Sequence, residues 1–356
     1  MKKIRVLVVD DSALMRKMMK KILESDPQIE VVGTARDGED GVEKARQLQP
    51  DVVTMDVNMP GMDGITALQI IVDEGICPVV MVSSLTQEGA EITFEALELG
   101  AFDYVPKPGG TISPNLEKVS HDVIEKVKAA SKAGVLNRLK RRLQRTKRPH
   151  FEKKETKKVS LDGEVTKAVA MGISTGGPKT LLEVIPELPE DLDAAIFIVQ
   201  HMPENFTASF ANRLNQHSQI SVKEASAGEN VKNTNGYLGK GGYHLLLRAK
   251  TNGDKVIRLS KKPETLFIPS VDVMMDSVLN IFGNKVVGVL MTGMGDDGVK
   301  GMLNIKRSGG ITIAESEETA IVFGMPKAAI EMGAADEVVP SYEIAKEIVN
   351  AIKSLD

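Results

Sequence analysis

Short apolar runs alternate with helical patterns over residues 1–125 of the chain. Nearly continuous apolar runs separated by helices are typical of a parallel sheet that is covered on both faces. The pattern therefore predicts one doubly wound α/β domain over residues 1–125, with a five-stranded parallel sheet. The expected strands are Ile4–Val9, Ile29–Ala35, Asp51–Met55, Pro78–Val82 and Asp103–Val105.

The same alternation resumes at Thr166, so residues 166–356 are expected to form a second and larger α/β domain. Asn252-Gly253-Asp254 separates two apolar runs and predicts an antiparallel hairpin over Tyr243–Leu259. The rest of this domain is expected to be mostly parallel. Its expected strands are Lys167–Met171, Ala194–Val199, Ile220–Lys223, Gly242–Arg248, Lys255–Leu259, Val286–Met291, Gly310–Ala314 and Glu337–Val339.

Composition excludes several classes of protein. The chain has 356 residues, of which 42% are apolar and 26% charged, and its net charge of −4 gives no general attraction to nucleic acid or anionic membranes. Cys77 is the single cysteine, which excludes an internal disulfide and a cysteine-cluster metal site. No apolar run approaches the roughly 20 residues that span a bilayer, and no signal peptide is visible. We expect a cytoplasmic protein that does not insert into the membrane or bind nucleic acid.

Residues 126–165 are expected to extend the last helix of the first domain and then to form a basic linker. Two interpretations of the basic stretch are open, a docking strip for an acidic partner and a solvated linker. The solvated linker is favoured, because aromatic residues are almost absent from the stretch and the whole chain is acidic. The basic residues are Lys140, Arg141, Arg142, Arg145, Lys147, Arg148, Lys153, Lys154, Lys157 and Lys158.

Acidic residues follow two expected strands of the first domain. Asp10 and Asp11 follow the first strand, and Asp56 ends the third. In an open parallel sheet these positions meet at one edge, where three carboxylates need a cation. Oxygen ligands favour Mg²⁺, which also binds phosphoryl groups. Ser83 and Lys107, at the ends of the fourth and fifth strands, are then expected to hold the phosphoryl oxygens.

The turn Gly172–Pro178 lies between an apolar run and a helical pattern. Ser174 on such a strand-to-helix turn would present its Oγ to a substrate, beside the N–H groups of the next helix. The alternative is a glycine-rich turn in which Ser174 or Thr175 only caps that helix. The sequence of the turn is therefore compatible with both roles for the side chain, a nucleophile and a helix cap.

A nucleophilic serine needs a base and a group that orients the base. The second domain has three histidines. His201 ends the strand that follows the Ser174 turn in sequence, which favours it as the base. His217 is expected at the surface, and His244, inside the hairpin, is expected to be packed.

The loop that follows Val286–Met291 has two interpretations. Gly293-x-Gly295-x-x-Gly298 matches a dinucleotide fingerprint, with Glu315 as the acid beyond it. Against this, two aspartates in the loop would face the pyrophosphate. An aspartate here is better placed to hold His201, while the glycines let backbone N–H groups form an oxyanion hole.

Residues 1–125 resemble the receiver domain of two-component response regulators, a flavodoxin-like fold. The resemblance implies that Asp56 accepts a phosphoryl group from a chemotaxis histidine kinase. It also implies a switch formed by Ser83, Tyr104 and Lys107. The Mg²⁺ ligands that it implies are Asp10, Asp11, Asp56 and the backbone carbonyl of Asn58. The motifs that carry the resemblance are Val8–Ser12, Met55–Gly64, Val82–Ser84 and Val105–Pro108.

Residues 166–352 resemble the catalytic domain of the chemotaxis receptor methylesterases, a Rossmann-like α/β fold. The resemblance implies that Ser174 is the nucleophile, His201 the general base and Asp297 its orienting partner. The backbone N–H of Met294 takes the oxyanion-hole position, and the ester reaction needs no cofactor. The motifs are Gly172–Pro178, Val199–Met202, Leu266–Asp272, Leu290–Gly298 and Phe323–Pro326.

Together the two resemblances imply an enzyme that hydrolyses glutamate γ-methyl esters on methyl-accepting chemoreceptors and deamidates receptor glutamines. The receiver is expected to cover the Ser174 edge until Asp56 is phosphorylated. Two other classes are weighed. A DNA-binding output would need a basic helix-turn-helix domain, which residues 166–356 lack. A phosphorylation-gated binding module with a vestigial triad is disfavoured because Ser174, His201 and Asp297 are all present.

Overall fold

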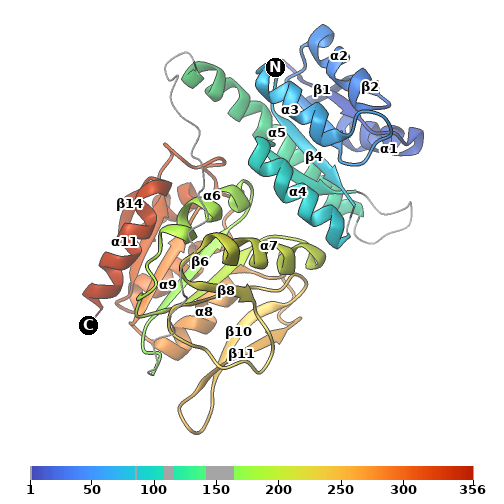
Figure 1. The fold of residues 1–356 in the computed structure, drawn as a ribbon. Coiled ribbons are helices and arrows are strands. Elements are labelled where there is room, and N and C mark those ends of the chain that lie inside the picture. Colours follow the sequence, from blue (N-terminus) through green and yellow to red (C-terminus); the bar gives the residue numbers. More distant parts are fainter. Residues whose placement is uncertain (1, 85, 108–115, 142–163, 356) are drawn as a thin grey trace. The chain divides into compact units, whose positions relative to one another are not determined.

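The computed structural model describes residues 2–84, 86–107, 116–141 and 164–355. The chain divides into two compact units, Met1–Pro149 and His150–Asp356. The division falls inside the segment 126–165 that we expect to link the domains. Residues 142–163, which hold most of the expected basic linker, lie outside the described residues. Each unit is an α/β layer structure in which helices cover both faces of a sheet (Figure 1).

The N-terminal unit has the predicted five-stranded parallel sheet, in the order β2-β1-β3-β4-β5. Helices α1 and α5 lie on one face and α2, α3 and α4 on the other. Because both faces are covered, β3 and β4 are buried along their whole length, which explains why most of their residues are apolar. The strands are β1 (Ile4–Val9), β2 (Ile29–Ala35), β3 (Val52–Asp56), β4 (Val79–Ser83) and β5 (Asp103–Pro106).

Side chains at the helix starts of this unit follow simple capping rules. Ser12, Asp37, Asp63 and Thr86 each accept a backbone N–H from the first turn of the helix that follows. The last helix runs on to Arg141, so it extends beyond residue 125 as expected. The helices are α1 (Ala13–Glu24), α2 (Gly38–Leu48), α3 (Gly64–Asp73), α4 (Gln87–Leu99) and α5 (Leu116–Arg141).

The C-terminal unit has a seven-stranded parallel sheet in the order β14-β13-β12-β6-β7-β9-β8, and a separate antiparallel hairpin of β10 and β11. The mostly parallel sheet and the hairpin were both predicted, and both are confirmed. The strands are β6 (Ala168–Ile173), β7 (Ala195–Gln200), β8 (Ser221–Glu224), β9 (Asn235–Leu238), β10 (His244–Ala249), β11 (Lys255–Ser260), β12 (Val286–Leu290), β13 (Ile311–Glu315) and β14 (Glu337–Val339).

Strand β9 is absent from the strands predicted by the apolar pattern. Its sequence is Asn-Gly-Tyr-Leu, which contains no apolar run. It becomes a strand because β7 and β8 pair with it from both sides. Strand formation here therefore depends on long-range pairing more than on local propensity.

Two groups of helices cover the large sheet. Helices α8, α9 and α10 lie on one face together with the hairpin, and α6, α7 and α11 lie on the other. The main core of the unit is packed between the sheet and the first group. The helices are α6 (Gly177–Val184), α7 (Glu204–His217), α8 (Val271–Phe282), α9 (Val299–Arg307), α10 (Met325–Glu331) and α11 (Ser341–Ser354), and a short 3₁₀ helix, η1 (Ile185–Glu187), follows α6.

The strand order places three loops side by side. The first strand of the unit, β6, pairs with β7 on one side and with β12 on the other. The chain therefore reverses its direction across the sheet at β6. Such a switch point leaves a crevice at the carboxyl ends of the strands, where ligands bind in open α/β sheets. The loops after β12, β6 and β7 surround this crevice.

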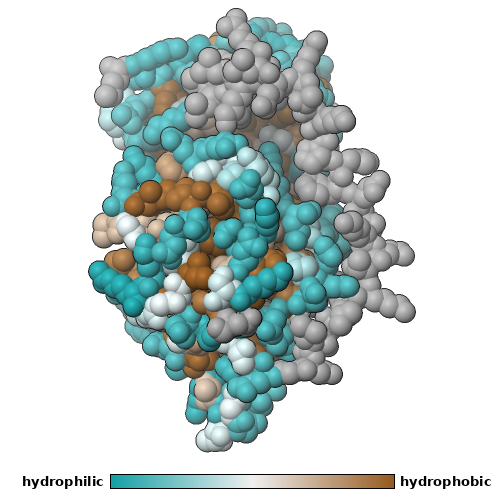
Figure 2. Space-filling model, turned by 90° about the vertical axis from the view of Figure 1, so that its left-hand side faces the viewer, coloured by the Kyte–Doolittle hydropathy of each residue, from teal (hydrophilic) through white to brown (hydrophobic). Residues whose placement is uncertain are grey.

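The surface of the C-terminal unit is largely hydrophilic, with separate hydrophobic areas on the face seen in Figure 2. Its exposed large apolar side chains, among the residues described, are Leu266, Met332, Val338 and Tyr342. None of the described helices combines the length and the apolar character needed to cross a membrane.

Candidate functional sites

Ser174, His201 and Asp297 come together at the carboxyl ends of β6, β7 and β12. The Ser174 Oγ lies 3.1 Å from Nδ1 of His201, and Nε2 of His201 lies 2.8 Å from Oδ2 of Asp297. The Asp297 contact fixes a hydrogen on Nε2, which leaves Nδ1 free to accept a proton from the serine. A serine, a histidine and a buried carboxylate in this order have the geometry of an acyl-transfer site.

The N-terminus of α8 holds the Asp297 carboxylate. Oδ2 accepts the N–H of Val271 at 2.8 Å, and Oδ1 accepts the hydroxyl of Ser270 at 2.8 Å and the N–H of Asp272 at 3.1 Å. Burial alone would raise the pKa of Asp297, but the hydrogen bond and charge of His201 and these N–H groups outweigh it, so the pKa is lowered. His201 and, after it, the helix end therefore keep the carboxylate ionised.

The ring of Phe267 stacks on the His201 imidazole. The ring centroids are 4.1 Å apart and the planes differ by 11°. This contact shields one face of the imidazole from water and limits its rotation. Phe267 lies in the loop before α8, within a motif to which the sequence analysis assigns no role, and no spacing signal points to it.

The Ser174 side chain does not cap helix α6. The N-cap position is Gly176, with φ of +77°, and no side chain caps the helix there. The Ser174 hydroxyl instead faces His201, while its backbone N–H donates to the carbonyl of Thr292 at 3.0 Å. The structure therefore decides against the helix-cap interpretation of this serine.

Gln200 joins the serine and histidine loops. Its Nε2 donates to the carbonyl of Ser174 at 2.9 Å and to the carbonyl of His201 at 3.1 Å, and the residue is 3% exposed. Helix α6 passes so close that a Cβ on Gly177 would lie 1.9 Å from Gln200 Oε1. The sequence analysis quotes Gln200 in a motif without a role, since only the folded chain shows which carbonyls it meets.

We expect Gln200→Glu to lower kcat toward an ester by roughly 10²-fold, because a small displacement of reacting groups costs this much. The change replaces a donor by an acceptor of the same size, so the His201 carbonyl loses this donor and the Ser174 carbonyl keeps only the N–H of Gly177 at 2.8 Å. An unsatisfied carbonyl costs roughly 1–3 kcal/mol. Gln219→Glu is the matched control, since Gln219 Nε2 donates to the Pro186 carbonyl at 3.3 Å away from the site. Steady-state kinetics would contradict the prediction if both variants kept wild-type kcat.

The loop after β12 does not have the arrangement of a dinucleotide site. Gly298 and Gly301, at the start of α9, already donate their N–H groups to the Asp272 carboxylate. The proposed ribose ligand, Glu315, is fully buried and accepts the N–H of Thr292 and the hydroxyl of Thr319. A pyrophosphate would therefore find the helix N-terminus occupied and the acid inaccessible.

Met294 lies on the same loop, beside the Ser174 turn. A Cβ on Gly293 would lie 2.8 Å from Cβ of Ser174, so the loop backbone passes next to the serine. Gly295 has φ of +86°, a conformation that favours glycine and turns the chain after Met294. This approach explains why the segment is rich in glycine.

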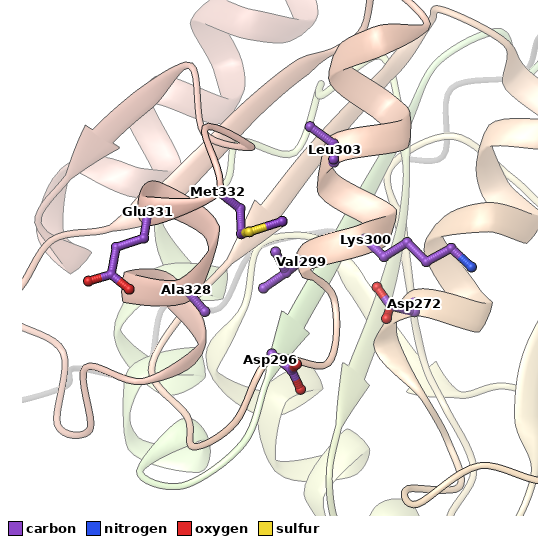
Figure 3. Close-up of a pocket in the computed structure, with 8 residues that line it drawn as sticks. All are labelled: Asp272, Asp296, Val299, Lys300, Leu303, Ala328, Glu331 and Met332. Atoms are coloured by element: carbon purple, nitrogen blue, oxygen red, sulfur yellow. The ribbon is translucent and has the colours of Figure 1, made fainter.

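A surface pocket of about 620 Å³ opens beside the loop that carries Asp297 (Figure 3). Side chains of α8, α9 and α10 and of the loop surround it, and its lining combines apolar and charged groups. The lining residues are Asp272, Asp296, Val299, Lys300, Leu303, Ala328, Glu331 and Met332.

Two further histidines in the described part of the C-terminal unit, His217 and His244, stand apart from Ser174. His217, expected at the surface, is half-buried at the end of α7. His244 is fully buried, as expected, and its Nδ1 accepts the N–H of Ser270 at 3.2 Å while Nε2 contacts the Pro263 carbonyl at 2.9 Å. His244 thus supports the residue that caps α8 and donates to Asp297.

The N-terminal unit gathers the acidic residues that follow β1 and end β3. One carboxylate oxygen from each of Asp10, Asp11 and Asp56 lies within 4.8 Å of the others. Lys107 Nζ lies 2.6 Å from Oδ2 of Asp56 and 3.5 Å from Oδ2 of Asp10. Burial raises the pKa of both Asp10 and Asp56, and the charge of Asp10 adds to the effect on Asp56.

These residues suit a divalent cation. Asp10 Oδ2 is buried, and its contact with the Lys107 ammonium, at 3.5 Å, is long for a hydrogen bond. The set offers oxygen ligands only. A hard cation would supply a closer partner and offset the burial of the carboxylates. Asn58 follows β3 and is exposed, at the same edge of the sheet.

The expected switch residues lie around the same edge. Ser83 is fully buried, and its Oγ lies 2.8 Å from the hydroxyl of Thr93 on α4. Tyr104 is 3% exposed and packs edge-on against Phe94 of α4, with the Lys126 ammonium 5.1 Å from its ring centroid. Both side chains therefore contact α4.

The chain was compared with known proteins. Residues 169–348 match the CheB methylesterase family and residues 6–113 the response regulator receiver domain. A protein-glutamate methylesterase/protein-glutamine glutaminase of Syntrophomonas wolfei is 61% identical, over 98% of this chain and 99% of its own; one of Carboxydothermus hydrogenoformans is 52% identical, over 99% and 100%. The solved CheB methylesterase catalytic domain of Thermotoga maritima is 45% identical, with a TM-score of 0.51, and covers 52% of this chain and 97% of that one.

Proposed function

This chain belongs to the CheB methylesterase family and carries a response regulator receiver domain, and from this premise we propose that Ser174 is the nucleophile with which it hydrolyses glutamate γ-methyl esters on chemoreceptors. The observation that carries the proposal is the contact of Ser174 Oγ with His201 Nδ1 at 3.1 Å, completed by Asp297 at 2.8 Å from Nε2. No simple cap or packing role accounts for these three side chains in this order.

The reaction is an acyl transfer in two steps. Nδ1 of His201 takes the proton of Ser174 as Oγ attacks the γ-carbonyl carbon, and the proton then passes to the methoxy oxygen, which leaves as methanol. A water molecule next gives its proton to Nδ1 and attacks the acyl-serine, which releases glutamate and returns the proton to Oγ. Attack on a glutamine amide by the same groups would release ammonia, as the glutaminase name of the relatives implies.

Two features stabilise the charges that form. The Asp297 carboxylate, held by the start of α8, faces the imidazolium that His201 becomes. The backbone N–H of Met294 is the proposed donor to the oxyanion, on a glycine-rich loop that passes next to Ser174. No cofactor takes part in these steps.

The receiver part of the proposal concerns Asp56. We assign it as the acceptor of a phosphoryl group from the chemotaxis histidine kinase, with Ser83, Tyr104 and Lys107 as switch residues. Asp10, Asp11, Asp56 and the Asn58 carbonyl would hold Mg²⁺, which neutralises charge on the phosphoryl group when it is bound. Lys107, already 2.6 Å from Asp56, would move its contact to the phosphoryl oxygens. Phosphorylation is proposed to raise esterase activity.

We expect methanol release from methyl-labelled chemoreceptor membranes to rise when a small phosphodonor and Mg²⁺ are added, by roughly 5- to 150-fold, the range typical of coupling between two sites. Asp56→Asn should abolish the response, because it removes the acceptor oxygen. Glu30→Gln, an exposed acid-to-amide change on β2, is the matched control and should respond like wild type.

Each part of this experiment has its own contradicting result. Absence of methanol release from wild type with and without the phosphodonor would argue against an esterase and in favour of a gated binding module. Methanol release at the same rate with and without the phosphodonor would support the esterase and contradict its control by the receiver domain.

A further inference from the structure

The N-terminus of α8 binds an aspartate that precedes α9, and the N-terminus of α9 binds an aspartate of α8. Asp297, which precedes α9, binds the first N–H groups of α8. Asp272, in the first turn of α8, binds in return the N–H groups of Gly298 at 3.0 Å and Gly301 at 2.7 Å through its Oδ1. Each helix start is thus capped by an acid from the other (Figure 3 shows Asp272 beside the start of α9).

This exchange holds the Asp297 loop on both sides. The carboxylate itself is bound by α8, and the next residue in the chain, Gly298, is bound by Asp272. Gly298 is also closely packed, because a Cβ there would lie 2.6 Å from both Leu290 and Val271. The backbone immediately after Asp297 is therefore held by the hydrogen bond from Gly298 to Asp272 and by close packing around Gly298.

We propose that Asp272 is a positioning residue for the esterase reaction, which acts by holding the loop after β12 so that Asp297 stays in contact with His201. The proposal rests on the proposed function and adds to it a residue that acts through Asp297 and makes no hydrogen bond to His201. Without the Asp272 side chain, the start of α9 would lose two hydrogen bonds and the loop would gain freedom at Gly298. Displacements of this kind near reacting groups are costly for kcat.

The chain keeps a second, half-buried acid beside Asp297, although neighbouring carboxylates destabilise each other. Burial raises the pKa of Asp272, and the Asp297 charge raises it further, while the N–H groups of Gly301 and Gly298 lower it. Two carboxylates at one helix junction repel each other, so packing alone would favour an uncharged residue. Retention of this acid is explained if its acceptor oxygen, more than its charge, is what the loop requires.

A second contact between the same helices provides a matched control. Asp276, one turn later on α8, accepts the side-chain N–H of Asn304 on α9 at 2.8 Å. Asp276→Ala removes a hydrogen bond of the same type from the same helix pair but leaves the Asp297 loop intact. Asp272→Asn keeps an oxygen at the acceptor position and removes only the charge.

The experiment compares Asp272→Ala, Asp272→Asn, Asp276→Ala and Asp297→Ala, and the Asp272→Ala/Asp297→Ala double variant, in the full chain. We expect Asp272→Ala to lower kcat for methanol release by about 10²-fold with KM within about threefold. Asp272→Asn and Asp276→Ala should remain within about threefold of wild type in kcat, since the loop keeps its anchor. In the Asp297→Ala background, Asp272→Ala should have no further effect, because it acts through Asp297.

Proton NMR provides a readout that does not depend on esterase activity. The His201 Nε2 proton, assigned by its absence in His201→Ala, should be seen in wild type, Asp272→Asn and Asp276→Ala and lost to exchange in Asp272→Ala. If Asp272→Ala does not fold, Asp272→Ser takes its place, since its hydroxyl is too short to reach both N–H groups.

Three results would each overturn the proposal: equal losses of kcat in Asp272→Ala and Asp276→Ala, additive losses of kcat with Asp297→Ala, or an unchanged Nε2 proton in Asp272→Ala. An inactive wild type with the expected NMR result would reject the esterase and keep the positioning role.

Discussion

Ser174→Ala is expected to lower kcat for methanol release by a factor on the order of 10⁶, as the loss of a triad nucleophile does in other serine hydrolases. The reason is that, among the residues the structure describes, only the Ser174 hydroxyl bonds to the His201 imidazole, at 3.1 Å. Asp297→Ala should cost less, on the order of 10⁴, because the imidazole remains present without its orienting carboxylate. Single-turnover measurements on labelled receptor membranes would give these rates.

The losses of kcat caused by substitutions in the triad should not be additive. His201→Ala alone is expected to remove as much activity as Ser174→Ala, and the double variant should be no worse than either, because the groups act as a unit. His217→Ala is the matched control, since His217 lies at the end of α7 and should leave kcat unchanged within a few-fold. A Ser174→Ala variant with wild-type release, or an additive double variant, would contradict the assignment of the triad.

Glu315→Gln is expected to stabilise the C-terminal unit at neutral and higher pH. Burial raises the pKa of Glu315 to about 7 from an ordinary value of 4.5; the N–H of Thr292 and the hydroxyl of Thr319 oppose the shift, and the Glu183 charge adds to it. The folded protein therefore holds a proton that the unfolded chain has lost. Its contribution to stability is full below pH 4.5 and is lost as pH rises through 7.

The change in the free energy of unfolding with pH follows from the difference between the pKa of Glu315 in the folded and the unfolded protein. A difference of about 2.5 pKa units corresponds to roughly 3 kcal/mol between the two ends of that pH range. Glutamine imitates the protonated carboxyl and titrates in neither state, so its advantage over wild type should grow by up to this amount between pH 4.5 and pH 8. Glu317→Gln, an exposed neighbour, should show no such trend.

Calorimetry at pH 5 and pH 8 would measure this difference, with loss of esterase activity identifying the transition of the C-terminal unit. Parallel pH profiles for wild type and Glu315→Gln would show that Glu315 has an ordinary pKa and would contradict the prediction. The same carboxylate holds Thr292, which accepts the Ser174 N–H on its carbonyl and donates its hydroxyl to the Thr175 carbonyl at 2.9 Å.

The local pattern of the chain was sufficient for the two α/β units. Unbroken apolar runs such as Val79–Val82 predict buried parallel strands, because a strand covered on both faces needs no polar side. The Asn252-Gly253-Asp254 turn predicted the β10–β11 hairpin because those residues favour the required backbone. Strand β9 was missed, since its four residues carry no such local signal.

The candidate chemistry was also visible in the sequence as residue types at strand ends. Ser174, His201 and the Asp10, Asp11 and Asp56 set were named because parallel strands deliver their carboxyl ends to one edge. The sequence alone did not decide between a nucleophile and a helix cap at Ser174, or between a triad and a dinucleotide loop after β12. Gln200, Phe267 and Ser270 were not identified, because their neighbours come from distant parts of the chain.

The sequence by itself determined the two α/β units, the hairpin and the strand-end residues. The signals for them are the spacing of apolar residues, the turn residues and the apolar runs, which all depend on residues close together in the chain. The tertiary structure alone decided that β12 lies against β6, which brings Asp297 to His201 across 96 residues. It also decided that the start of α8 holds that aspartate and that Asp272 holds its loop. Such contacts depend on strand order and helix packing, which the burial of a shared core selects over the whole unit and which no local pattern encodes.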